Sequence, residues 1–378
     1  MNDPFSSLTG WVGGIVAVVL GTLLGRLLTT TVTRWLGEKS RLERVVELVA
    51  VAAAVGLWWW EVPAGRLTPL AADGSLFEVQ PTILLARWAG HLVFFTLLAA
   101  ATWIDMRYRV IPDWITVTGV MLGLVVACLL PEPFLPVGWE VERSFAPPAI
   151  LPDVLAAFGG LRSVPGPVWL GGMPHLGGLA VAGLIFLTWW FFCTAPFIEA
   201  ESSGRSSPLP SAALEPRNMV FVAGLGGIVV VWFMGGHRFD ALQAGLIGLA
   251  VAAGLVWGVR EGASHAMGRE AMGFGDVTLM AMIGVWLGWQ PAILVFFLAT
   301  FLGLAHGVLG LLLHRDNELP YGPSLCLATV LVVVGWRPLW AAVGGYFADP
   351  VLLAIMLVAV VVLTAAALWV WQWVRGAR

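Results

Sequence analysis

Charged side chains are scarce in this sequence. Asp, Glu, Lys and Arg together make up 11% of the 378 residues, whereas apolar residues make up 59%. This balance excludes an ordinary soluble globular domain, because too little polar surface remains to face water. The net charge of -3 and the lack of a basic stripe with interleaved aromatics also give no reason to expect a nucleic-acid partner. The composition predicts an integral membrane protein whose main surroundings are the lipid bilayer.

Cysteine is also rare, and we find neither an internal repeat nor a separate soluble domain. The three cysteines, Cys128, Cys193 and Cys326, lie far apart in apolar segments, where a thiol usually serves as a small buried hydrophobe. Two histidines, His91 and His306, lie in apolar segments as well. Each either marks a proton path or satisfies a neighbouring carbonyl.

Long apolar segments fill most of the chain. About 20 apolar residues cross the hydrocarbon core, and a backbone in lipid must satisfy its own hydrogen bonds, so each segment should be helical. The predicted fold class is all-α, a polytopic transmembrane helix bundle of about eleven helices. The expected helices cover residues 8–28, 43–60, 82–104, 114–130, 176–198, 218–234, 240–259, 277–289, 291–313, 322–346 and 351–373.

Arginine and lysine are divided unevenly between the loops. One set of alternate loops holds fourteen of them and the other set holds six. The positive-inside rule then predicts an N-terminus outside, a C-terminus inside, and cytoplasmic helix ends at Asp105 and Asp276. The first apolar segment lacks a basic n-region and a small-residue cleavage site, so we expect a retained helix rather than a signal peptide.

The first intramembrane carboxylate stands in "TWIDMRYRVIPDWITVTGV". Asp105 follows a full apolar helix, and Pro112 opens the next helix, where a missing N–H does no harm. Asp113 is well placed to cap that helix. Asp105 itself is either an interfacial carboxylate paired with Arg107 or Arg109, or a functional group.

The second carboxylate stands in "AMGFGDVTLMAMIGVWLGW". Gly273 and Gly275 flank Phe274 and permit a tight turn and the close approach of another helix. Asp276 follows at once. It could be an N-cap for the helix at 277–289, but a cap does not require glycine on both sides of Phe274.

Taken together, the two aspartates permit a mechanism that neither permits alone. Two carboxyl groups within a few ångströms cannot both ionise easily, so one stays protonated while the other acts as a base. Such a pair can activate water and polarise a peptide carbonyl at once. The sequence therefore permits aspartic proteolysis within or beside the bilayer.

Three segments resemble the type IV prepilin peptidases, the bacterial branch of the GxGD membrane aspartyl proteases. "IDMRYRVIPDWIT" is similar to the first motif of that family, with Asp113 where Asn is usual. "REAMGFGDVTLMAMIGVWLGW" is similar to the second motif, including Glu270, Gly284 and Gly288. "ELPYGPSLCLA" resembles a third segment, in which Tyr321 replaces the usual Phe.

The resemblance implies an activity and a site. Asp105 and Asp276 would be the catalytic pair of an aspartic endopeptidase of the bacterial inner membrane. It would cleave the leader of prepilin or pseudopilin substrates at the cytoplasmic face, just before their hydrophobic helix. No metal and no organic cofactor is implied for the cleavage. The supporting motif residues would be Pro112, Gly273, Gly275, Pro320, Gly322 and Pro323, the last three shaping the start of the next helix.

The chain also departs from the family pattern. Many members carry two CxxC pairs after the first helix, with the spacing of a structural zinc site. This chain has no cysteine before Cys128, which excludes a zinc-bound subdomain, and the sequence gives no support for N-methyltransferase activity. We divide it into N-terminal helices, a helix pair with Asp105, an inserted loop with two extra helices, and C-terminal helices with the GxGD motif. These parts are residues 1–81, 82–130, 131–238 and 239–378.

Two other functions remain open from the sequence. A secondary transporter also uses intramembrane carboxylates and helices broken by glycine and proline. Against it, we find no paired inverted repeat, and both aspartates are predicted at one membrane face rather than at the midplane. A catalytically inactive paralogue that binds prepilin-like segments is the other alternative, although the chain keeps both aspartates.

Overall fold

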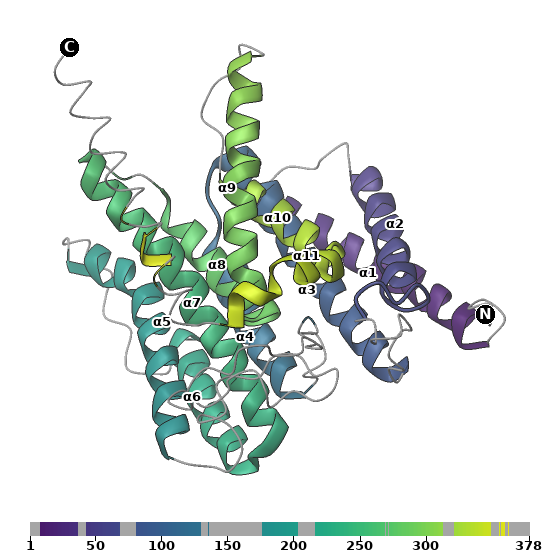
Figure 1. Cartoon of the computed structure of the whole chain (residues 1–378), viewed down its shortest axis with the longest axis horizontal. Helices are drawn as coiled ribbons and strands as arrows, with labels where there is room; N and C mark the ends of the chain where they lie inside the picture. The colour runs from purple at the N-terminus through teal and green to yellow at the C-terminus, as the bar shows by residue number, and fades with distance from the viewer. Residues whose placement is uncertain are drawn as a thin grey trace.

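A computed structural model (Figure 1) describes residues 8–36, 43–68, 81–129, 135, 176–202, 216–268, 270, 272–312, 321–348, 355, 357–359 and 362. Within these residues the secondary structure is helical, without a strand, and the all-α fold class is confirmed. Most of the predicted helix 351–373, nearly all of the loop at 131–175, and Pro320 lie outside the described residues. The α-helices are α1 (Leu8–Leu36), α2 (Glu43–Glu61), α3 (Pro81–Tyr108), α4 (Asp113–Leu129), α5 (Leu176–Ser202), α6 (Pro216–Met234), α7 (Gly236–Met267), α8 (Phe274–Leu287), α9 (Trp289–Leu312), α10 (Gly322–Val334) and α11 (Trp336–Val343), followed by the 3-10 helix η1 (Gly344–Ala348).

Several of these helices are long enough to cross a bilayer. In the described part of the chain, α1, α3, α5, α7 and α9 are both long and apolar enough to do so. The bent pair α10 and α11 would add one more span if it acts as a single broken helix. Helices α4, α6 and α8 are apolar but shorter. The chain is therefore a multi-pass membrane protein, while the predicted orientation of its termini stays a prediction.

The prediction of one helix over 322–346 is wrong. The chain bends by 87° between α10 and α11, at Gly335. Pro338 has no N–H to donate to the carbonyl four residues earlier, that of Val334, so the helix cannot continue there. The indole N–H of Trp60 donates to this Val334 carbonyl instead, at 3.1 Å. A proline three residues past the bend thus ends the helix, and α2 satisfies the freed carbonyl.

Helix α8 forms the centre of the bundle. Every residue from Asp276 to Leu287 is buried, and α4, α7, α9 and α10 pack around the helix. Gly248 on α7 lies directly against Gly284 on α8, so that a Cβ on either residue would overlap the carbonyl of the other. Such glycine contacts let two helix backbones approach closely. On another side of α8, the Trp286 indole N–H donates to the Gly119 carbonyl of α4 at 2.9 Å.

The remaining helices flank this centre on opposite sides (Figure 1). The hairpin of α1 and α2 packs on α3, with Gly21 and Gly25 of α1 against Ala54 and Ala50 of α2. Helices α5 and α6 pack on each other and on α7. The two helices that the sequence predicted in the inserted segment thus lie beside α7, and not between α3 and α8.

Candidate active site

A cavity of about 460 Å³ lies where α3 ends and where α8 and α10 begin. Both Asp105 and Asp276 line it. They reach it from two helices, Asp105 from the end of α3 and Asp276 from the start of α8. The residues around the cavity are Asp105, Arg109, Val110, Ile111, Met272, Gly273, Phe274, Gly275, Asp276 and Tyr321. All three sequence segments that resemble the family motifs therefore contribute to one cavity.

Asp105 lies in the last turn of α3. Its side chain is buried, and its Oδ2 atom has no hydrogen-bond partner in the part of the chain that the structure describes. It forms no ion pair within the described residues, so pairing with Arg107 or Arg109 does not explain its position. The backbone of Gly322, at the start of α10, lies so close that an added Cβ would overlap Oδ2. The buried carboxyl group is therefore held by packing rather than by a counter-ion.

Asp276 lies in the first turn of α8 and is also buried. The interpretation of Asp276 as an N-cap is wrong, because the N-cap position is Gly273, which makes no side-chain capping bond. Asp276 is instead the third residue of the helix. The N-terminal turn of a helix carries a partial positive charge that favours an anionic group. This position offers some compensation for burying a carboxylate.

The turn between α3 and α4 forms one wall of the cavity. Arg109 has a φ of 56°, in the left-handed region that residues other than glycine seldom adopt. Ile111 follows and lies against Gly275, where an added Cβ would come within 3.1 Å of the isoleucine Cβ. Pro112 then leads into α4. The glycine before Asp276 thus allows the close approach expected from the sequence, and the partner that approaches is this turn.

The start of α10 lies against this turn and also borders the cavity. Gly322 is the first residue of the helix, and Pro323 stands in its first turn, where its missing N–H leaves no carbonyl unpaired. The ring of Tyr321 lines the cavity, and its hydroxyl lies 3.3 Å from the Thr300 hydroxyl of α9. The tyrosine hydroxyl is thus directed to a neighbouring helix.

One further residue, which the sequence analysis missed, contacts the segment before Asp276. Arg260, near the end of α7, donates from Nε to the Met272 carbonyl at 3.0 Å and from one terminal nitrogen to Glu270 at 2.5 Å. Its guanidinium also lies 5.9 Å from the centre of the Phe274 ring. Arg260 therefore ties the chain before α8 to α7. Its position ten residues before Glu270 gave no signal, because the contact depends on how α7 and α8 pack.

Comparison with known proteins finds a family that matches part of this chain. Residues 213–308 match the type IV leader peptidase family. The chain carries a type IV leader peptidase region. This leader peptidase region holds α6, α7, α8 and most of α9, and therefore Asp276, whereas Asp105 lies outside it. It also includes α6, which the sequence analysis had assigned to the inserted segment.

Relatives of this chain among known proteins support the family match. The prepilin leader peptidase/N-methyltransferase of Aeromonas salmonicida is 36% identical over 93 residues, which are 24% of this chain and 30% of the relative. The prepilin leader peptidase/N-methyltransferase of Pseudomonas aeruginosa is 29% identical over 157 residues, 41% of this chain and 50% of the relative. Leader peptidase HopD of Escherichia coli is 37% identical over 106 residues, 27% of this chain and 64% of the relative. No solved structure matches the chain.

The resemblance to type IV prepilin peptidases is confirmed by these matches. This chain nevertheless spans less than two thirds of the length of each of these relatives. Two of them are named as N-methyltransferases as well as peptidases, whereas HopD is named as a leader peptidase only.

Proposed function

We propose that this protein is a membrane aspartic endopeptidase that cleaves the leader of prepilin-like substrates at the cytoplasmic face. The observation that carries the proposal is the pair of buried aspartates, Asp105 and Asp276, that line one cavity from two different helices. The family match of residues 213–308 and the names of the relatives support the choice of substrate.

The chemistry follows from two carboxyl groups in one partly dry cavity. Because two negative charges in one cavity repel, the resting pair holds one proton between Asp105 and Asp276. The ionised carboxylate takes a proton from a water molecule, and the resulting hydroxide attacks the carbonyl carbon of the scissile peptide bond. The protonated carboxyl donates a hydrogen bond to the carbonyl oxygen as this oxygen becomes negative. A proton then passes to the leaving nitrogen, the C–N bond breaks, and a new acid and a new amine result.

The position of the cavity suits such a reaction. It lies at the ends of apolar helices, where single water molecules can enter while a substrate arrives from the lipid. Glycine at 275 and 322 lets the turn after α3 and the start of α10 approach the aspartates closely. This packing excludes bulk water around the carboxyl groups and so strengthens their electrostatic interactions.

The proposal is tested by co-expression with a candidate prepilin from the same genome. Processing of the leader is followed on a gel, and the new N-terminus is identified by mass spectrometry. We expect wild type to remove the leader and the Asp105→Asn and Asp276→Asn variants to leave it intact. Absence of cleavage by wild type, or unchanged cleavage by either variant, refutes the proposal. Proton-driven uptake by liposomes would instead favour the transporter.

A further inference from the structure

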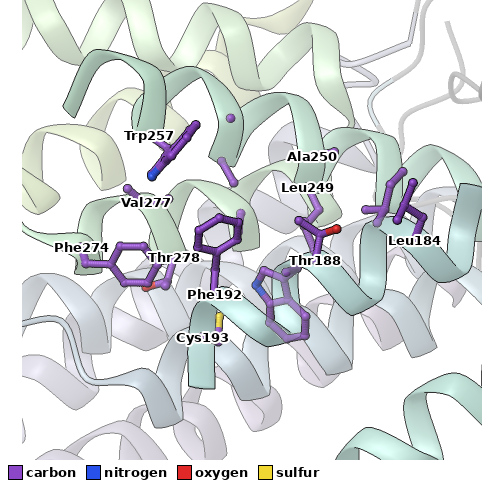
Figure 2. Close-up of a pocket in the computed structure, with 15 residues that line it drawn as sticks. Leu184, Thr188, Phe192, Cys193, Leu249, Ala250, Trp257, Phe274, Val277 and Thr278 are labelled. Carbon is purple, nitrogen blue, oxygen red and sulfur yellow. The ribbon is translucent and has the colours of Figure 1, made fainter. Parts of the chain in front are cut away.

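A second hollow lies beside the aspartate cavity. It is a groove of about 360 Å³ between α5, α7 and α8, and we call it the α5 groove. Figure 2 shows its lining, with Phe274, Phe192 and Trp257 gathered towards one end and Leu184 at the other. From Phe192 to Leu184 the groove follows α5 for about 12 Å, since each helical residue rises about 1.5 Å. That length equals roughly two turns of an α-helix.

The α5 groove adjoins the aspartate cavity. Phe274 lines both hollows. From there, Val277, Thr278 and Ala281 continue the groove along α8, immediately after Asp276. The groove therefore begins beside Asp276, on the same helix.

The lining of the α5 groove is apolar, and the residues that α7 contributes include small ones. Ala250, Ala253 and Gly254 on α7 lie on one face of the helix, and an added Cβ at Gly254 would meet no atom within 4 Å. The Thr278 hydroxyl, one of two in the lining, already donates to the Gly275 carbonyl at 3.0 Å. The occupant must therefore be apolar and able to pack closely against α7, as one helix packs on another in lipid.

The position of the groove favours one occupant. Val277 and Thr278, which line it, follow Asp276 directly on α8, and Phe274 lines both the groove and the aspartate cavity. A polypeptide held at the aspartates therefore has this apolar hollow next to it. This neighbourhood favours a segment of the same polypeptide as the occupant.

We propose that the α5 groove binds the apolar segment that follows the cleaved bond of the substrate. The proposal rests on the proposed function, and it assigns a role to α5, which lies outside the matched residues 213–308. With the scissile bond between Asp105 and Asp276, the first two turns of the apolar segment lie along α8 and contact Phe192 and Trp257. Helix α5 then contributes to the choice of substrate.

Site-specific photo-cross-linking tests the contact. A benzophenone amino acid replaces Phe192 in the Asp276→Asn variant, which is expected to hold uncleaved prepilin. The matched control carries the same group at Phe301 on α9, another exposed phenylalanine of an apolar helix. We expect prepilin to cross-link through its apolar segment from position 192 and not from position 301. Cross-links to lipid alone, or to prepilin equally from both positions, overturn the proposal.

A groove-filling variant gives a second, kinetic measurement. Gly254→Leu places a side chain in the groove, and Gly227→Leu on α6 is its control, because an added Cβ at either glycine meets no atom within 4 Å. We expect Gly254→Leu to raise KM for prepilin about tenfold with little change in kcat, since apolar pockets discriminate by such factors. A KM equal to that of wild type, in a variant with the thermal stability of wild type, overturns the proposal.

The two proposals fail in different ways. If wild type cleaves no prepilin, the proposed function fails, and the cross-link from position 192 alone decides the groove. If wild type cleaves and neither the cross-link nor the KM effect appears, the groove proposal fails while the peptidase stands.

Discussion

Within the described residues, carboxyl groups are buried in two places, which differ in how these groups are compensated. In α2 and α3, Glu61 and His91 form a hydrogen-bonded pair with 2.7 Å between Oε1 and Nδ1, and the side chains are 1% and 0% exposed. At the other end of α3, Asp105 is buried without an ion pair within the described residues and faces Asp276 across a cavity.

This difference separates a structural polar group from a reactive one. The Glu61 carboxyl gains a close hydrogen bond through Oε1 and links two helices, although its Oε2 has no partner within the described residues. A buried carboxyl that faces a like group keeps an electrostatic cost, which packing elsewhere must offset. Such a cost is retained where it serves a reaction. The contact between Glu61 and His91 is therefore structural, whereas the catalytic hypothesis concerns Asp105 and Asp276.

The largest expected effect is a loss of cleavage activity, which should occur at the aspartates and not at Glu61. Asp105→Asn and Asp276→Asn should each lower the rate of prepilin cleavage about 10³-fold, because an amide can neither take nor give the proton. The matched variant Glu61→Gln should cleave at the wild-type rate per folded molecule. The measurement is single-turnover cleavage in detergent micelles. Equal losses in all three variants would show that the comparison is wrong.

The free energy of unfolding should depend strongly on the pair of Glu61 and His91. Glu61→Ala removes the carboxylate that contacts the buried Nδ1 of His91 and should cost about 3–5 kcal/mol of unfolding free energy. Glu47→Ala, on the half-buried part of the same helix, should cost less than about 1 kcal/mol. Chemical denaturation in micelles measures both. A cost at Glu61 no larger than that at Glu47 would contradict a structural role for the pair.

An added methyl group beside the aspartate cavity should strongly lower kcat. Gly322→Ala pushes against Oδ2 of Asp105, and a displacement of a catalytic group by about 1 Å can cost about 10²-fold in rate. Gly303→Ala on α9 is the control, because its added Cβ meets its nearest atoms at an ordinary 3.7 Å. We expect kcat to fall in the first variant only. Similar rates for both would mean that the position of Asp105 is not critical.

Arg260 allows a test of how the segment before α8 is positioned. Arg260→Gln removes the contacts to Glu270 and to the Met272 carbonyl and should lower kcat about tenfold with KM unchanged. Glu270→Gln should add little to this loss, because both changes release the same segment. Glu261→Gln is the control, since Glu261 contacts Arg260 within α7 only. Full additivity of the Arg260 and Glu270 changes would refute the shared role.

The smallest effect is expected at Tyr321. Its hydroxyl lies 3.3 Å from that of Thr300 and 3.5 Å from the Phe296 carbonyl, so the contacts are long. Tyr321→Phe, which restores the residue usual in the family, should change cleavage less than about twofold and stability less than about 1 kcal/mol. A tenfold loss of kcat would mean that the hydroxyl takes part in the reaction.

The sequence predicted part of the site because its signals are local. Glycine spacing, Ile-Pro after Asp105 and the third motif each depend on a few neighbouring residues, and all three reach the same cavity. The N-cap alternative for Asp276 failed because the helix begins two residues earlier, at Phe274. The single helix expected over 322–346 failed because the apolar pattern continues across a bend that Pro338 produces.

The sequence by itself determined that this chain is helical and membrane-embedded, because long apolar segments in lipid must satisfy their own backbone hydrogen bonds. It also identified Asp105 and Asp276 as a candidate pair. Only the tertiary structure decided that these aspartates share a cavity, that Arg260 holds the segment between α7 and α8, and that α5 forms a groove beside Phe274. Those contacts join residues far apart in the chain, and their geometry arises from helix packing, where glycine contacts such as Gly248 with Gly284 set how closely the helices approach.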